Sequence, residues 1–280
     1  MSSYSVLMSV YSKEEPAFFK ESIQSMLNQT QRTDDFVIVC DGPLTEELDD
    51  VLRQYQRMYP DIFQIIRLSQ NVGIGAAMNA GLQMCKNDLV AKMDADDIAI
   101  PSRCELQIER FLENPQLTIL GGFIAEFDSD AEHPFSIRSV PESNESIRTF
   151  AKRRQPFNNV TVMYRKAAVI AVGGYSNLLR NEDYDLYIRL LANGYYAENL
   201  PIILVNARVD EATRRHRASK DTLIGCVQSR WRAFRSGYSS FRDFLFCVAG
   251  KFAICISPGI VQEKIYSKYL RSPTRDDLET

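Results

Sequence analysis

The 280-residue chain lacks most of the features that would set a class by themselves. It holds one tryptophan, two histidines and six cysteines, and no two cysteines have the CxxC spacing. A disulfide framework or a zinc ribbon is therefore excluded, and we expect free, reduced thiols. The net charge of −3 gives the molecule no overall attraction to nucleic acid. Phosphate-bearing ligands would have to be held locally.

Targeting signals and long apolar runs are also missing. The N-terminus lacks the basic start, long apolar stretch and cleavage site of a secretory signal. The most apolar stretch, 244–261, is interrupted by Lys251 and broken at Pro258-Gly259, whereas a membrane-spanning helix needs about 20 apolar residues. We expect a cytoplasmic protein, with the inner face of the membrane as an alternative location.

The first hundred residues alternate apolar runs with segments of helical spacing. Strands are predicted over 4–11, 35–42, 63–69 and 88–94, and helices over 16–30, 45–60 and 73–85. Continuous apolar strands joined by helices indicate a parallel sheet covered on both faces. Ligands of such sheets bind beyond the carboxyl ends of the strands. Because Asp41 and Asp94 both follow strands, they should converge on one crevice.

The remaining chain is less regular. Helices are predicted over 101–115, 145–153 and 181–194, strands over 117–128 and 160–166, and a flexible turn over 172–175. From about 215 the chain is helical, and from 242 it is strongly apolar. Three interpretations of this apolar segment stay open: a helix packed on the main domain, a contact between copies, or a membrane-surface helix flanked by Arg242 and Lys264. Packing or self-association is the preferred one.

The most specific local pattern is MDADD, which places Asp94, Asp96 and Asp97 at a strand end. Neighbouring carboxylates repel one another unless a positive charge lies between them. A hard divalent cation would supply that charge and keep positions free for phosphate oxygens. A solvated acidic turn is the simpler alternative, but the position after an apolar strand favours the metal.

A glycine-rich turn, NVGIGAAMNAG, precedes the predicted helix over 73–85. Its small residues let a helix N-terminus approach an anion or another backbone closely. Gly73 and Gly75 match the first two glycines of a dinucleotide-binding motif, but Met78 stands at the third position. The turn also follows the third strand rather than the first, which argues against dinucleotide binding.

Two further polar clusters can be interpreted either as parts of an active site or as ordinary structural features. Glu182, Asp183 and Asp185 lie near a helix start, where one could act as a general base or all could serve the helix dipole. His216 stands in a basic run, 214–217, from which it could reach a metal or a diphosphate. A solvated basic turn is the alternative for that run.

Taken in order, these segments resemble family 2 glycosyltransferases of the GT-A fold, especially bacterial enzymes of surface-polysaccharide and glycan assembly. The similarity runs to about residue 220 and is most specific in the acidic block that continues into Pro101, Arg103 and Gln107. It implies an α/β, Rossmann-like, mainly parallel sheet flanked by helices. The catalytic domain would be 1–220, with a nucleotide-sugar half (1–100) and an acceptor half (101–220). A helical C-terminal extension would occupy 221–280.

The resemblance also implies roles for individual residues. Asp183 would be the base of an inverting transfer to a glycan hydroxyl, lipid-linked or on a protein, and Glu182 would orient it or touch the acceptor. Asp94 and Asp96 would hold Mn²⁺ or Mg²⁺ together with His216. A UDP-sugar would lie against Ser9, Val10, Tyr11, Asp41, Gly73, Asp94, Ala95, Asp97 and Arg103. Asn159 and Cys104 depart from the family pattern, in which many relatives carry His and an aromatic or Leu.

Two rival functions are weighed against this one. A nucleotidyltransferase would carry a glycine-rich basic loop after the first strand, and SVYSKEEP is not such a loop. A nucleotide-sugar-binding protein without transfer activity would not need the complete set of Asp41, Asp94, Asp96 and Asp183. The sequence therefore favours an active glycosyltransferase.

Overall fold

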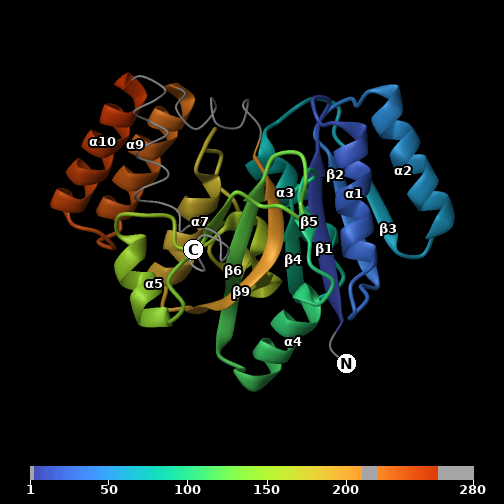
Figure 1. Ribbon diagram of the computed structural model, residues 1–280. Coiled ribbons are helices and arrows are strands. Elements are labelled where there is room, and N and C mark those ends of the chain that lie inside the picture. The colour runs from blue at the N-terminus through green and yellow to red at the C-terminus, as the bar shows by residue number, and fades with distance from the viewer. Residues whose placement is uncertain (1–2, 210–219, 258–280) are drawn as a thin grey trace.

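One sheet of nine strands runs through the described residues, 3–209 and 220–257, of this computed structural model (Figure 1). The strands are β1 (Tyr4–Val10), β2 (Asp35–Cys40), β3 (Phe63–Arg67), β4 (Leu89–Met93), β5 (Ile98–Ala99), β6 (Leu117–Phe127), β7 (Ser136–Arg138), β8 (Met163–Arg165) and β9 (Tyr196–Arg208). The helices are α1 (Pro16–Leu27), α2 (Glu46–Met58), α3 (Ile74–Met84), α4 (Arg103–Glu113), α5 (Asn144–Ala151), α6 (Lys166–Ala171), α7 (Glu182–Ala192), α9 (Lys220–Arg235) and α10 (Phe241–Ile256).

The N-terminal half forms the parallel part of the sheet, as predicted. Its strands lie in the order β3-β2-β1-β4, and each pair is parallel. All residues of β2 and β4 are buried, because helices cover both faces and leave no polar side. The carboxyl ends of β1, β2 and β4 therefore meet at one edge, which brings the turns after them together.

The second half extends the sheet with mixed pairing. Strand β8 joins β4 to β6 through antiparallel pairs, and β6 pairs with β9 in parallel. The predicted strand over 160–166 is a short 3₁₀ helix, Asn159–Thr161, followed by β8. No strand was predicted over Tyr196–Arg208, yet β9 is the longest one described. Its end pairs with β5, which directly follows the acidic turn.

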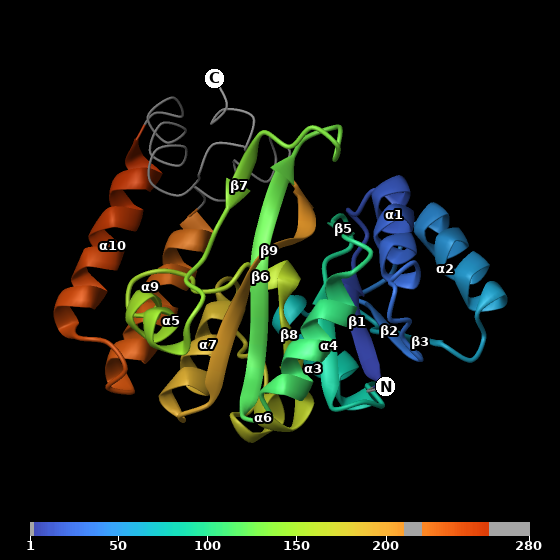
Figure 2. The same ribbon diagram turned by 60° about the horizontal axis from the view of Figure 1, so that its bottom comes forward.

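Helices cover the sheet in two layers with separate cores (Figures 1 and 2). Helices α1, α2 and α4 pack on one face through residues such as Phe19, Leu52 and Phe111. Helices α3, α5, α6 and α7 pack on the other face through residues such as Leu82 and Leu186. This is the doubly covered α/β architecture that the sequence predicted, and it includes the helical C-terminal extension.

Helices α9 and α10 form a hairpin at the side of the molecule away from α2 (Figure 1). Helix α9 packs against α7, and α10 packs against α9 and is the outermost element on that side (Figure 2). The apolar segment from 242, for which packing on the main domain was one expectation, packs mainly on α9 and meets the main domain at Arg153, which pairs with Asp243 and lies over the Phe246 ring. In the portion of the chain that the structure describes, no helix is long and apolar enough to cross a membrane. All six cysteines are free, as expected.

Candidate active site

The acidic turn after β4 is tied to a buried lysine. Lys92 lies in β4 with 1% of its surface exposed, and its ammonium forms an ion pair with the carboxylate of Asp94. The Ser22 hydroxyl donates to the carbonyl oxygen of Asp94 over 2.7 Å, which fixes the backbone of the turn against α1. A charged lysine is tolerated at this depth because it is paired.

The end of β9 holds the other side of this turn. The backbone N–H of Arg208 donates to the Asp97 carboxylate over 2.7 Å, and its Nε donates to the carbonyl oxygen of Asp96 over 3.2 Å. The Arg208 guanidinium lies 3.7 Å from the ring centroid of Phe18 and 4.6 Å from that of Phe127. The sequence interpretation missed Arg208, because its partners lie more than a hundred residues earlier.

Negative charge gathers beside this turn. Burial raises the pKa of Asp96 to about 6, and the Asp94 carboxylate adds to the shift. Burial also raises the pKa of Glu14 to about 7, with further contributions from Asp96 and Asp94. Glu14 was not among the predicted site residues, although it follows β1 at the same edge. Asp97 is buried, and its pKa is raised well above the ordinary value by burial and by its two acidic neighbours.

This donor set fits a hard cation. The partly buried carboxylates of Glu14, Asp94 and Asp96 share one neighbourhood, and Lys92 is the ammonium paired there. Oxygen donors with excess negative charge are what Mg²⁺ and Mn²⁺ prefer. Within residues 3–209 and 220–257, no three Asp, Glu, His or Cys side chains are arranged to hold a metal ion by themselves. Additional ligands, such as phosphate oxygens, would therefore be required.

Asp41 organises the glycine-rich turn. Its carboxylate is buried and accepts hydrogen bonds from the N–H groups of Val72 (2.7 Å) and Gly73 (3.1 Å). Gly73 has φ of 88°, a left-handed conformation that favours glycine. Asp41 thus sets the shape of the turn that opens α3. Its expected contact with the nucleobase stays a prediction.

The second acidic group lies at the start of α7. The Asp183 carboxylate accepts hydrogen bonds from the Gln155 side chain (2.6 Å) and the Tyr184 N–H (2.7 Å). Burial raises the pKa of Asp183, and burial together with the Asp183 charge raises the pKa of Glu182 to about 8. A carboxylate with a raised pKa accepts a proton more readily, as a general base must.

The two acidic groups belong to one site. The charges of Lys92 and Asp94 both act on Asp183, so the turn after β4 faces the start of α7. Helix α3 connects them further: the Asn79 side chain donates to the carbonyl oxygen of Tyr175 and accepts from its N–H, both over 2.8 Å. This pair of bonds, the Asn79–Tyr175 clamp, ties the glycine-rich helix to the loop that leads to Asp183.

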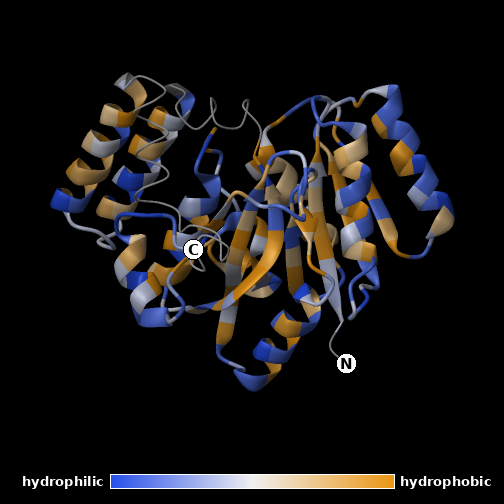
Figure 3. Cartoon of the chain, viewed as in Figure 1, coloured by the Kyte–Doolittle hydropathy of each residue, from blue (hydrophilic) through white to orange (hydrophobic). Residues whose placement is uncertain are grey.

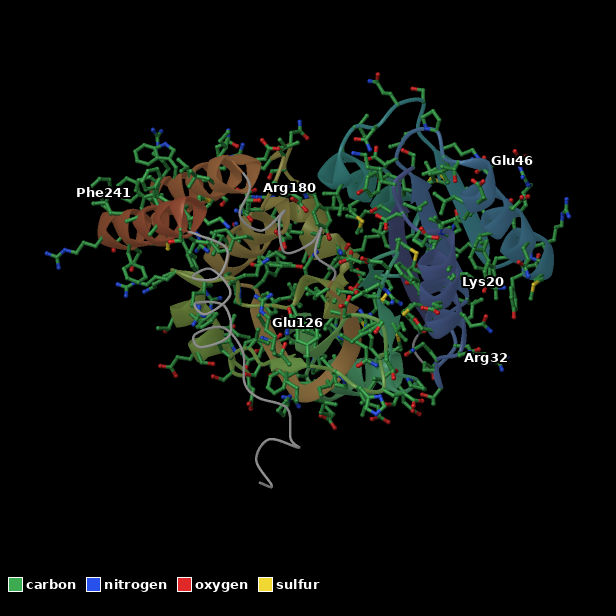
Figure 4. The ribbon with its side chains drawn as sticks, turned by 45° about the horizontal axis from the view of Figure 1, so that its top comes forward. Lys20, Arg32, Glu46, Glu126, Arg180 and Phe241 are labelled. Atoms are coloured by element: carbon green, nitrogen blue, oxygen red, sulfur yellow. The ribbon has the colours of Figure 1, made fainter. Side chains whose placement is uncertain are left out.

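Gly75 permits this close approach. A Cβ atom at position 75 would lie 2.6 Å from the carbonyl oxygen of Ser176, well inside normal contact. Arg180, labelled in Figure 4, is close enough to lower the pKa of Glu182. The segment from Tyr175 to Asn181 leads to Asp183 and is called the base loop. It therefore lies directly beside the glycine-rich turn.

The remaining predicted residues differ in placement. Tyr11 is exposed just beyond β1, Ser9 is half-buried, and Val10 and Ala95 are buried. Arg103 is fully buried and donates to the carbonyl oxygen of Lys92 over 2.7 Å. It therefore supports β4 from within the protein, and its expected part in the donor pocket stays a prediction. His216 lies outside the described residues.

Comparison with solved structures shows the same fold. A mannosyltransferase from Pyrobaculum calidifontis, solved with GDP-Man and Mn²⁺, has a TM-score of 0.66 at 15% identity and covers 99% of this chain and 78% of its own. The S. aureus TarS 1–349 structure with UDP has a TM-score of 0.61 at 16% identity and covers 95% of this chain and 72% of its own. The fold is thus that of GT-A glycosyltransferases.

The chain belongs to glycosyl transferase family 2, whose model matches residues 5–179. A glycosyltransferase of Haemophilus influenzae is 39% identical over 96% of this chain and 99% of the relative. The Escherichia coli UDP-Gal:alpha-D-GlcNAc-diphosphoundecaprenol beta-1,3-galactosyltransferase is 34% identical over 96% of both chains. The Erwinia amylovora amylovoran biosynthesis glycosyltransferase AmsE is 38% identical over 73% of this chain and 76% of its own. The protein is a glycosyltransferase, as the sequence predicted.

Proposed function

We propose that the enzyme transfers a sugar from a UDP-sugar to a hydroxyl of a lipid-linked glycan, with inversion at the anomeric carbon. The observation that carries this proposal is the meeting of two acidic groups at one sheet edge: Asp94 and Asp96 after β4, and Glu182 and Asp183 at the start of α7. Asp94 and Asp96 would bind the donor diphosphate through a cation, and Asp183 would take the proton of the attacking hydroxyl.

The donor end would be assembled at β1, β2 and β4. Asp94 and Asp96 would hold Mn²⁺ or Mg²⁺, and the remaining ligands would come from phosphate oxygens and water. When bound, the cation would stabilise the negative charge that develops on the departing diphosphate. A uracil nucleotide is favoured because the 34% identical relative is named for UDP-Gal and the TarS structure holds UDP.

The transfer itself would be a single displacement. As the acceptor oxygen attacks, a bond forms between that oxygen and the anomeric carbon, and the bond from that carbon to the diphosphate oxygen breaks. Asp183 takes the hydroxyl proton, and UDP leaves with the electron pair. The Gln155 amide and the Tyr184 N–H hold the Asp183 carboxylate in place for this step. Glu182, whose pKa is raised to about 8, remains largely protonated at neutral pH and leaves Asp183 as the charged member.

The acceptor is inferred from the same relative. Its name specifies GlcNAc joined through a diphosphate to undecaprenol, and the relative aligns with this chain over nearly the full length of both. We therefore propose a diphosphate lipid carrying one or more sugars as the acceptor class. A protein-linked glycan was the sequence-based alternative and has no comparable support.

The test is a transfer assay with a panel of UDP- and GDP-sugars and a GlcNAc-diphosphate acceptor on a short alkyl chain, with Mn²⁺ or with EDTA. We expect a disaccharide product with one UDP-sugar and none with EDTA. Asp183→Asn should retain UDP binding yet lose transfer by on the order of a hundredfold or more, and Asp96→Asn should lose Mn²⁺-dependent UDP binding.

The matched control is Asp50→Asn, since Asp50 is an exposed acid on α2 whose partner is Arg53. It should transfer at the wild-type rate. Release of pyrophosphate instead of UDP would show a nucleotidyltransferase. Binding of UDP-sugars without product from any acceptor would support the binding-protein alternative.

A further inference from the structure

The outward face of α10 is apolar, which is unusual for the outermost helix of a protein. Phe241, Leu245, Phe246 and Phe252 are 49%, 50%, 63% and 53% exposed, and Figure 3 shows hydrophobic colours over most of this helix. Helix α2, on the other side of the molecule, exposes mainly charged and amide side chains, with Met58 as its one strongly exposed apolar residue. Surface helices normally resemble α2 in this respect.

The side of α10 that faces the protein already makes hydrogen bonds and ring contacts, which hold the helix in this orientation. Ser240 and Asp243 form a capping box at its start, and Asp243 bonds to Arg153 over 2.5 Å. Trp231 of α9 lies 5.4 Å from the ring of Phe244, and Phe234 lies 5.5 Å from that of Phe241. Phe244 therefore faces α9, and Phe241 meets α9 at one edge while 49% of its surface stays exposed. Figure 4 shows Phe241 at the outer end of the hairpin.

We propose that this face of the α9–α10 hairpin docks on a bilayer that contains anionic lipids. Exposed aromatic and aliphatic side chains beside arginines are the composition of helices that lie in a membrane interface. Residues 220–257 hold six basic and two acidic residues, although the whole chain carries −3; Arg230 and Arg232 contact α7 and are not counted toward the outward face. Arg235 and Arg242 are exposed at the same end of the hairpin. Anionic head groups complement this charge.

The same charge argues against a second copy of the chain as the occupant. A two-fold contact centred on Arg235 and Arg242 would bring the same positive charges of both copies close together. The charge thus favours the membrane-surface interpretation over self-association, which the sequence had ranked first together with packing.

The hairpin is also joined directly to the helix that carries the proposed base. The Arg230 guanidinium lies 3.7 Å from the ring centroid of Tyr184, the residue after Asp183, and Arg232 lies 3.5 Å from the Asp185 carboxylate. Docking through α10 would therefore hold α7 at a fixed position relative to the lipid surface. This consequence rests on the proposed lipid-linked acceptor, whereas the docking itself does not.

The single tryptophan makes the test direct. Trp231 is 42% exposed within the α9–α10 contact, so its fluorescence reports on the hairpin alone. With vesicles of phosphatidylcholine and phosphatidylglycerol, we expect the full chain to cosediment and its emission to shift to shorter wavelength. Pure phosphatidylcholine should give weaker binding, and Arg235→Gln/Arg242→Gln should remove most of the difference between the two vesicles.

The decisive variant is Leu245→Gln/Phe246→Gln/Phe252→Gln, which should lower vesicle affinity at least tenfold. Its matched control is Met58→Gln/Met84→Gln/Leu112→Gln, which changes three apolar residues with similar exposure elsewhere and should bind as the wild type does. Both variants should transfer sugar normally to the short-chain acceptor, which shows that they fold.

Three results would overturn the proposal. The wild type could fail to bind either vesicle, the α10 variant could bind as tightly as the wild type, or the wild type could be a dimer that this variant converts to a monomer without any vesicle binding. Normal transfer to the short-chain acceptor combined with any of these results would reject the docking and leave the proposed function intact. Vesicle binding without transfer to any acceptor would reject the function alone.

Discussion

Replacing Arg208 by methionine should loosen the acidic turn from the end of β9. The side chain is 7% exposed, and methionine fills similar volume without the charge, so the change removes polar contacts rather than opening a large cavity. It removes the bond to the Asp96 carbonyl, the contacts over the Phe18 and Phe127 rings, and the ion pair with Glu21.

The size of the effect follows from these contacts. A charged hydrogen bond contributes about 1.5–3 kcal/mol, the two ring contacts together about 1 kcal/mol, and an ion pair with the half-exposed Glu21 less than about 1 kcal/mol. We therefore expect Arg208→Met to lower the free energy of unfolding by about 3 kcal/mol. Arg208→Lys keeps the charge but lacks the planar set of N–H donors of the guanidinium, so it should lose less of the free energy of unfolding than Arg208→Met.

Urea unfolding followed by circular dichroism measures the stability, and calorimetry of UDP with Mn²⁺ measures the site. The control is Arg53→Met, in an exposed ion pair of α2; its free energy of unfolding should stay within about 0.5 kcal/mol of the wild type. Arg208→Met should lower the affinity for UDP more than this control does. If Arg208→Met matched that control in both measurements, the proposed role of β9 in holding the turn would be refuted.

Two other predictions concern the base loop. Because burial raises the pKa of Glu182 from about 4.5 to about 8, folding favours its protonated form; this contribution to stability is full below pH ~4 and is lost as the pH rises through about 8. Glu182→Gln should flatten the fall in urea stability over this range, and an unchanged slope would show that other groups cause it. Gly75→Ala should push on the Ser176 carbonyl and lower the transfer rate by roughly tenfold to a hundredfold. Gly250→Ala, where a Cβ meets nothing within 4 Å, should leave the rate unchanged, and equal rates for the two variants would contradict the steric argument.

The parallel half of the fold was predictable because local signals agree there. Strands β1, β2 and β4 are mostly apolar, and each ends in a polar turn, so the parallel sheet and the edge that carries Asp41 and Asp94 follow from the sequence. Antiparallel pairing of β8 with β4 and β6 has no such local signal, since it depends on contacts between segments about seventy and forty residues apart.

Strand β9 shows why the second half was harder. Its sequence contains Pro201, which argues against a strand, but the structure places the exposed Pro201-Ile202 step beside irregularities in the β6–β9 register. Because β9 was missed, Arg208 was missed with it. The acids of the site were identified since carboxylates cluster along the chain, whereas Glu14, Gln155 and the buried position of Arg103 depend on tertiary contacts.

The Asn79–Tyr175 clamp has a mechanical consequence. The Asn79 amide bonds to both the backbone N–H and the carbonyl oxygen of Tyr175. Helix α3 therefore cannot shift along its axis unless the Tyr175 segment moves with it. Any displacement of α3 would therefore be shared by the segment that leads to Asp183.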